Sequence, residues 1–213
     1  GTCRRQRQMC IRDSEYTNQI KDALKWLGLN WDEDIVLQSK NNDRHQEMVA
    51  KMLKDGTAYK CFLQKEELDN LRKESEQRKE IFRVPQTFRN LSPEKEKALI
   101  EEGKSFTVRL KVPKGETEFN DLVYGSIKVQ NKDLDDFIIA RSDGSPTYNF
   151  VVAVDDADMK ISHVIRGDDH LANTPKQILV YRALGLDVPI FAHLPMILGS
   201  DKKRLMKNIF QDL

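Results

Sequence analysis

Residues that could bind a ligand directly follow the apolar end of a predicted strand: Arg166, Gly167, Asp168, Asp169 and His170. An arginine at a strand end can hold a carboxylate through two parallel hydrogen bonds, each contributing about 1.5–3 kcal/mol. The Asp169 carboxylate can accept hydrogen bonds from ribose hydroxyls, His170 can pack on a nucleotide, and Gly167 would let the backbone approach a ligand. Alternatively, Arg166 and the two aspartates form a structural ion-pair network that caps the next helix.

A second cationic stretch, Asp201–Asn208 (DKKRLMKN), contains Lys202, Lys203, Arg204 and Lys207. Flexible lysines at such a position can neutralise phosphate charge as it shifts during phosphoryl or nucleotidyl transfer, which needs placed cations more than a base. Lysine-rich loops are more often simply solvated, so composition alone favours a surface loop.

Other polar residues are weaker candidates. Tyr148 opens an apolar run, and its hydroxyl can point into a cleft or only stabilise the preceding turn. The segment Val154–Asp158 (VDDAD) lacks a definite metal-ligand spacing, so we interpret it as a solvated turn. His45 and His193 are isolated in the sequence, which favours a satisfied structural role for each.

Length and composition limit the functional class. The chain has 213 residues, 39% of them hydrophobic, and 35 basic against 34 acidic residues, so bulk charge indicates no nucleic-acid partner. Its three cysteines form no CxxC pair, which favours reduced thiols over a disulfide or zinc framework. No apolar run approaches the roughly 18 residues that span a bilayer. We therefore expect a soluble, cytoplasmic protein without a membrane partner.

The first part of the chain should contain two helices. Residues 1–13 show neither helical nor strand periodicity of apolar residues, so we expect an unstructured leader. Ser14 can cap a helix that Gly28 ends, and a second helix is predicted at 43–54.

The middle of the chain, roughly 60–140, reads as a mixed α+β unit. A highly charged helix should be exposed at 65–79, and Ser92 with Pro93 should begin another that closes at Gly103. Strands are predicted at 59–63, 106–112, near 123–129 and at 137–140.

The last part should form a parallel α/β sheet. The apolar run Tyr148–Val154 reads as a strand buried on both faces. A strand ending near Arg166, a helix from Asn173 or Thr174 to Gly185 and a strand at Ile190–Leu198 then make a βαβ unit, which places the fold in the doubly wound α/β class. In such sheets ligands bind at the carboxyl ends of the strands.

Several segments taken together resemble the catalytic half of a bacterial-type glutamyl-tRNA synthetase, a class I aminoacyl-tRNA synthetase. They are FNDLVYGSIKV, DDFIIARSDGSPTYNFVVAVDDADMKISHVIRGDDHLANTPKQ and GSDKKRLMK, with YTNQIKDALKWLGLNWDE and AYKCF fitting the same family. The resemblance implies a partial Rossmann-type catalytic domain at 14–59 and 141–213. It also implies an inserted α+β domain at 60–140 that binds the tRNA acceptor end.

The resemblance further implies a reaction and its participants. Glutamate would attack the α-phosphate of ATP, supplied with Mg²⁺, to give glutamyl-adenylate, and the terminal ribose of tRNA would then take the glutamyl group. The implied site residues are Tyr148, Asn149 and Arg166 for glutamate, Asp169, His170 and Lys207 for ATP, and Lys203, Arg204 and Lys207 as the charge-stabilising KMSKS-type loop.

The sequence departs from the family pattern in several places. The family's HIGH-type signature is missing, residues 1–13 match nothing in the family, and no anticodon-binding domain follows. We therefore expect a non-native leader and a fragment that is inactive alone. Met206 and Asn208 replace the usual loop residues. The zinc site of many relatives begins with a Cys-x-Cys. Here Cys61 is followed by Phe62 and Leu63, and no Cys-x-His partner appears near 83–90, so we expect no zinc.

Two other interpretations stay open at this point. A shortened paralogue could glutamylate a modified tRNA nucleoside, since such proteins also lack the anticodon-binding domain. The chain could instead be a non-catalytic RNA-binding module that uses only the 60–140 unit. For the synthetase reading we expect a monomer.

Overall fold

The computed structural model describes residues 17–30, 35–80 and 82–196, and the chain divides into two compact units, Gly1–Lys40 and Asn41–Leu213. In the first unit residues 17–26 are helical, as predicted, and the helix ends at Gly28 with a left-handed φ of 74°. The predicted cap Ser14 lies outside the described residues. The short 3-10 helix η1 (Gln38–Lys40) closes this unit.

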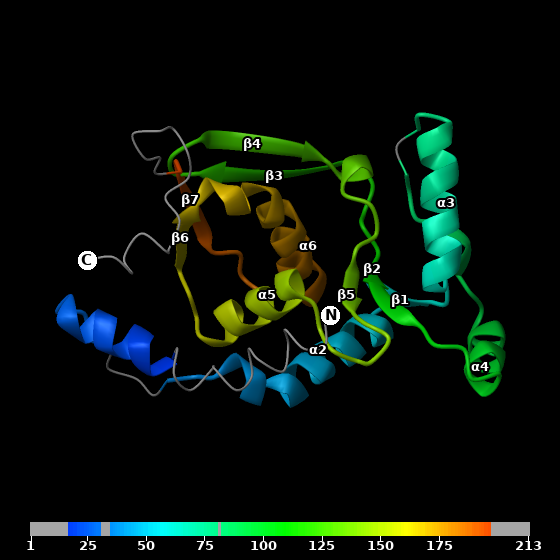
Figure 1. Ribbon diagram of the computed structural model, residues 1–213, viewed down its shortest axis with the longest axis horizontal. Coiled ribbons are helices and arrows are strands. Elements are labelled where there is room, and N and C mark those ends of the chain that lie inside the picture. The colour runs from blue at the N-terminus through cyan, green and yellow to red at the C-terminus, as the bar shows by residue number, and fades with distance from the viewer. Residues whose placement is uncertain (1–16, 31–34, 81, 197–213) are drawn as a thin grey trace, which may run out of the picture. The chain divides into compact units, whose positions relative to one another are not determined.

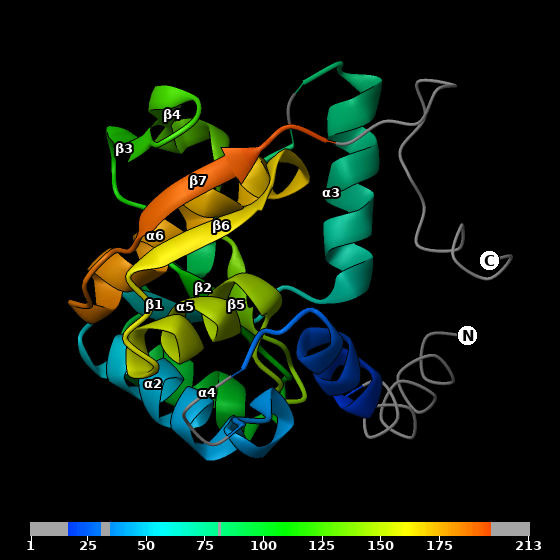
Figure 2. The same cartoon turned by 90° about the vertical axis from the view of Figure 1, so that its left-hand side faces the viewer.

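The second unit contains a four-stranded sheet with strand order β4-β3-β7-β6. The strands β6 and β7 are parallel and run side by side in Figure 2, joined by α6, which confirms the predicted βαβ unit. The strand β3 is parallel to β7 and antiparallel to β4. The bounds are β3 (Glu116–Asp121), β4 (Gly125–Gln130), β6 (His163–Gly167), α6 (Thr174–Leu184) and β7 (Ile190–Leu194).

A second, antiparallel sheet has the order β1-β2-β5 (Figure 1). Its strands agree with three of the predicted ones and are β1 (Ala58–Cys61), β2 (Thr107–Leu110) and β5 (Ile138–Ala140). The strand β3 was not predicted, because the side chains on its buried face include the polar Thr117 and Asp121. Thr117 is satisfied there by a 2.6 Å hydrogen bond from its hydroxyl to Asn131 Oδ1. Pairing of β3 with β7 joins part of the 60–140 segment to the parallel sheet.

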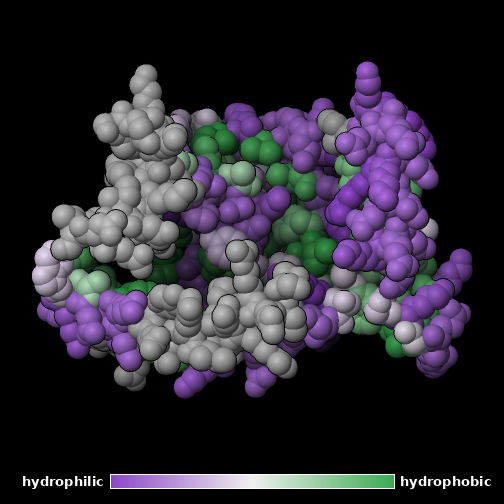
Figure 3. Space-filling model, viewed as in Figure 1, coloured by the Kyte–Doolittle hydropathy of each residue, from purple (hydrophilic) through white to green (hydrophobic). Residues whose placement is uncertain are grey.

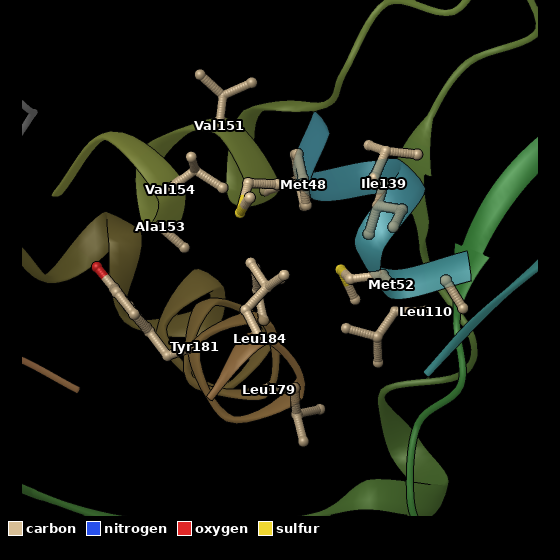
Figure 4. Close-up of a cluster of buried hydrophobic side chains, with 14 of the residues drawn as sticks. Met48, Met52, Leu110, Ile139, Val151, Ala153, Val154, Leu179, Tyr181 and Leu184 are labelled. Carbon is tan, nitrogen blue, oxygen red and sulfur yellow. The ribbon is translucent and has the colours of Figure 1, made fainter. Parts of the chain in front are cut away.

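The prediction of a strand at Tyr148–Val154 is wrong, since this segment is the first part of helix α5 (Tyr148–Asp158). An apolar run of this length does not distinguish a strand from a buried helix by periodicity. The deciding factor is packing: Val151 and Val154 lie near Met48 of α2 and Leu184 of α6 in Figure 4.

The remaining helices follow their local sequence signals. The helix α4 begins where predicted, with Ser92 Oγ accepting a 3.4 Å hydrogen bond from the Lys95 amide. All residues of α3 are at least partly exposed, and the surface over this helix is hydrophilic in Figure 3. The bounds are α2 (Asn42–Lys54), α3 (Lys65–Gln77), α4 (Pro93–Glu101), η2 (Gln86–Phe88), η3 (Asn131–Asp133) and η4 (Asp168–Asn173).

The hydrophobic core of the second unit draws on both sheets and on α2, α5 and α6. Side chains from α2, α5 and α6 meet in its centre (Figure 4). Among the described residues, no helix combines the length and apolar character needed to cross a membrane.

Candidate functional site

The carboxyl ends of three parallel strands bring together residues that are far apart in the sequence. Asp121 is the last residue of β3, Arg166 lies next to the end of β6, and His193 lies next to the end of β7. Arg166 is in register with His193, while Asp121 is in register with Phe191. This edge is where ligands bind in open α/β sheets.

The guanidinium of Arg166 is fixed by neutral groups. Its Nε–H donates to His193 Nε2 at 3.1 Å, and its Nη2 donates to Thr174 Oγ1 at 2.9 Å and Gln177 Oε1 at 2.8 Å. The group also lies 5.6 Å from the ring centroid of Phe191. Burial lowers the pKa of Arg166, but a guanidinium remains protonated in proteins.

These contacts decide between the two interpretations of Arg166. Its hydrogen bonds to described residues go to neutral partners, while Asp156 and Asp169 act on it as nearby charges without a hydrogen bond to the guanidinium. Because Nε and Nη2 are engaged, the usual pair of parallel bonds is not available to a carboxylate. The hydrogen-bonding capacity left on the guanidinium is at Nη1, since among the described residues none bonds to this nitrogen.

His193 is buried together with Asp121. The His193 Nδ1 atom lies 2.6 Å from Asp121 Oδ2, and the backbone amides of Val123 and Tyr124 each donate to Oδ1 at 3.0 Å. Burial acts to raise the pKa of Asp121, but these hydrogen bonds outweigh it and lower the pKa to about 2. The satisfied role predicted for His193 agrees with this pairing. Its contact with Arg166 was not foreseen.

Tyr148 and Asn149, which the resemblance predicts to bind the substrate glutamate, lie at the start of α5. Asn149 Oδ1 accepts a 3.4 Å hydrogen bond from Gln177, which also holds Arg166. The Tyr148 ring is half exposed, and its centroid lies 6.3 Å from that of His170. Gln177 therefore links Asn149 to Arg166, while Tyr148 lies beside His170.

The two aspartates after β6, Asp168 and Asp169, have different neighbours. Asp168 Oδ2 accepts a 2.9 Å hydrogen bond from the Tyr124 hydroxyl, and this bond raises the pKa of Tyr124. A Cβ added to Gly167 would lie 2.6 Å from Asp169 Oδ1, so this glycine makes room for the Asp169 carboxylate. The predicted loop cations Lys203, Arg204 and Lys207 lie outside the described residues.

Comparison with known proteins shows the family to which the chain belongs. The family described as tRNA synthetases class I (E and Q), catalytic domain, matches residues 10–211 of the chain. The chain belongs to this family.

Relatives and solved structures agree with the class I synthetase assignment. The chain is 50% identical to the glutamate–tRNA ligase of Lawsonia intracellularis and 51% identical to that of Aquifex aeolicus, each over 91% of its length. It spans 40% and 41% of the lengths of these relatives. The crystal structure of a glutamate tRNA ligase from Elizabethkingia meningosepticum in complex with its amino acid matches with a TM-score of 0.82 at 35% identity. That match covers 95% of this chain and 43% of the other.

The acidic segment Val154–Asp158 of this synthetase chain is not the solvated turn that we predicted. It forms the end of α5, and its carboxylates have separate partners. Asp155 Oδ1 lies 2.7 Å from His45 Nε2, Asp156 accepts from the Tyr181 hydroxyl at 3.3 Å, and Asp158 accepts from Arg44 at 2.9 Å. Among the residues described for this synthetase chain, no group of three or more His, Cys, Asp or Glu could hold a metal ion.

Cys61, the cysteine considered above as a possible zinc ligand, has a buried free thiol. The neighbouring Phe62 ring packs against two other aromatic rings, with centroids 5.8 Å from Phe88 and 5.5 Å from Phe106. Aromatic packing therefore stabilises this corner of the synthetase chain.

Proposed function

We propose that this chain is part of the catalytic domain of an enzyme that ligates L-glutamate to tRNA through glutamyl-adenylate, with ATP bound as its Mg²⁺ complex. A carboxylate oxygen of glutamate attacks the α-phosphorus of ATP and pyrophosphate leaves. The terminal ribose hydroxyl of tRNA then attacks the activated carbonyl, and AMP leaves. The names of the two relatives at 50% and 51% identity support this assignment.

The observation that carries the proposal is the arrangement around Arg166. A permanent positive charge is held at the carboxyl end of β6 by hydrogen bonds to neutral partners, so no carboxylate of the described residues takes up its hydrogen bonds. A carboxylate bound at Nη1 would form a charge-assisted bond in a partly buried place, where such bonds are strong. Amino-acid activation needs this kind of positioning more than it needs an acid or base.

The other residues take the following roles in our proposal. Tyr148 and Asn149 line the glutamate position beside Arg166, while Asp169 and His170 contact the adenylate. Lys203, Arg204 and Lys207 supply positive charge to the phosphates as pyrophosphate leaves. A covalent nucleophile is not required, because the substrate carboxylate itself attacks.

We also propose that the 60–140 segment binds the tRNA acceptor end. A recess of about 600 Å³ in this segment is lined by Arg83, Arg89, Lys114 and Lys132 together with the carboxylates of Asp135 and Asp136, and the two arginines pair with Asp133 and Asp136. Lys114 and Lys132 are exposed, and both can approach phosphate groups. Cations placed around a recess favour a phosphate backbone even when the net charge of the chain is only +1.

A chimera tests the proposed reaction. Residues 41–196 would replace the matching segment of the Aquifex aeolicus relative, and glutamate-dependent ATP–pyrophosphate exchange would be measured. We expect exchange within about tenfold of the parent enzyme, which corresponds to about 1.4 kcal/mol in the barrier. A folded chimera that shows no glutamate-dependent exchange would contradict the proposal.

A further inference from the structure

Three side chains from three neighbouring strands form a continuous chain of hydrogen bonds that ends on the proposed substrate ligand. Asp121 of β3 contacts His193 of β7 at 2.6 Å, and His193 contacts Arg166 of β6 at 3.1 Å. Asp121 and His193 are 1% and 0% exposed, so water does not compete for their hydrogen bonds. A buried pair of this kind has well-defined proton positions.

The surroundings specify which ring nitrogen of His193 carries the proton. Asp121 receives backbone amide protons on Oδ1 and faces His193 Nδ1 with Oδ2, so an ionised carboxylate requires a donor at Nδ1. At the other nitrogen, Nε2 faces the Nε–H of Arg166, and the Thr174 hydroxyl lies 3.0 Å away. Donors therefore converge on Nε2, which must be an acceptor.

We propose that Asp121 and His193 are positioning residues for Arg166. Asp121 holds His193 in the Nδ1–H tautomer, and the free lone pair on Nε2 then fixes the Nε–H of Arg166. With Nη2 bound to Thr174 and Gln177, the guanidinium has one orientation, in which Nη1 is turned to the substrate carboxylate. The inference rests on the proposed function in one respect, namely that this carboxylate belongs to glutamate.

The Asp121→Asn substitution tests the tautomer directly. The backbone amides on the Oδ1 side would retain the side-chain oxygen of the introduced asparagine, which turns its NH₂ group toward His193 Nδ1. His193 would then have to accept at Nδ1 and carry its proton on Nε2, facing the Nε–H of Arg166. Two donors would oppose each other, and the guanidinium would lose its fixed orientation.

The measurement is ¹⁵N NMR of the full 213-residue chain, observing the histidine ring nitrogens and the Arg166 Nε–H signal. We expect the Nδ1–H form and a slowly exchanging Arg166 Nε–H in the parent chain. In the Asp121→Asn variant we expect the Nε2–H form and fast exchange. Asp156→Asn is the matched control, because it also removes a carboxylate charge near Arg166 but leaves His193 untouched. Identical spectra for the parent and Asp121→Asn chains would overturn the proposal.

Two substitutions of His193 separate positioning from a merely structural role. His193→Gln can place its Oε1 where Nε2 accepts from Arg166, whereas His193→Asn can only reproduce the donor to Asp121. We expect L-glutamate, titrated into the full chain, to bind His193→Gln within about threefold of the parent. Binding to His193→Asn should be at least about tenfold weaker, because displacements near 1 Å can cost up to about a hundredfold.

The opposite order of affinities would show that only the donor to Asp121 matters and would overturn the proposal. If the parent chain and both variants bind no glutamate while ATP–pyrophosphate exchange is also absent from the chimera, the proposed function fails. The tautomer and the Arg166 Nε–H exchange would still decide whether Asp121 and His193 position Arg166. The two proposals can therefore fail separately.

Discussion

Arg166 combines a permanent charge with a fixed direction. Hydrogen bonds to His193, Thr174 and Gln177 fix the guanidinium on two of its three nitrogens, so the side chain is preorganised before a ligand arrives. Preorganisation lowers the entropy that binding must remove. The value of this residue for binding thus depends on its neighbours as much as on its charge.

The Arg166→Lys substitution should separate charge from geometry. Lysine keeps the positive charge but cannot donate to His193, Thr174 and Gln177 together. We expect the KM for glutamate in the exchange reaction of the chimera to rise by at least about tenfold, or about 1.4 kcal/mol. Arg182→Lys, on the exposed side of α6, is the matched control and should leave KM unchanged. An unchanged KM in Arg166→Lys would argue against the role of this residue.

Asp121 should make the stability of the chain depend on acid pH. Its pKa falls from the usual value near 3.8 to about 2 in the folded state. The ionised form therefore stabilises the fold above about pH 4, and this contribution is lost as the pH falls toward 2. The Asp121→Asn variant has no carboxyl group at this position, so this pH-dependent contribution is absent from its stability. The difference in free energy of unfolding between parent and variant should shrink by on the order of 2 kcal/mol between pH 5 and pH 2.

Chemical denaturation at a series of pH values measures this difference. Comparison with the variant is needed, since other carboxyl groups such as Asp158 and Asp143 also have lowered pKa values. A difference that stays constant with pH would mean that Asp121 is not held in its ionised form.

At the scale of elements, packing of the buried face of α5 positions the two residues that we propose to bind the substrate glutamate. Phe150, Ala153 and Val154 are almost fully buried against the core, while Asn149 on the first turn accepts a hydrogen bond from Gln177 and Tyr148 lies near His170. The same helix therefore packs the core and presents the site.

Phe150→Ala should destabilise the second unit strongly. Phe150 is 0% exposed, and removal of a buried phenyl ring leaves a cavity that costs about 3–5 kcal/mol. Thermal or chemical unfolding measures the loss. Ser92→Ala is a contrasting change, because it removes only the cap of α4 and should cost about 1 kcal/mol. Equal losses for the two variants would contradict this description of the core.

At the scale of the whole molecule, the proposed function uses two regions: the four-stranded sheet, to which the 60–140 segment contributes β3 and β4, and the recess lined by Lys114 and Lys132. The sheet carries Arg166 and its partners. Lys114 lies between β2 and β3, Lys132 lies in η3, and both are exposed, which suits the contact with tRNA phosphates that we propose. Net charge does not reveal this arrangement, because it averages over the whole surface.

The double change Lys114→Ala and Lys132→Ala should weaken binding of a tRNA acceptor-stem helix and reduce its salt dependence. Each phosphate contact that is lost lowers the slope of log K against log salt by about 1. Lys73→Ala with Lys97→Ala removes the same charge from α3 and α4 and should leave the slope unchanged. A titration with salt measures both variants, and equal slopes in the two would argue against the recess as the tRNA contact.

Much of the fold could be predicted because its signals are local. Ser92 and Pro93 begin α4, Gly185 ends α6 with a φ of 70°, and the alternation of short apolar runs with a capped helix predicts β6-α6-β7. The two errors at 148–158 have a common cause. Apolar and acidic runs look alike in a strand, a turn or a helix until their packing partners are known.

The sequence by itself determined the βαβ unit, the residues at its strand ends and the resemblance to a synthetase family. It could not indicate which groups Arg166 binds. Asp121 and His193 are 72 residues apart, and they meet only because β3 adds to β7 in the tertiary structure. Proton positions on His193 follow from donors and acceptors on three other elements, namely β3, β6 and α6. Such an arrangement depends on long-range strand pairing, so only the folded chain decides it.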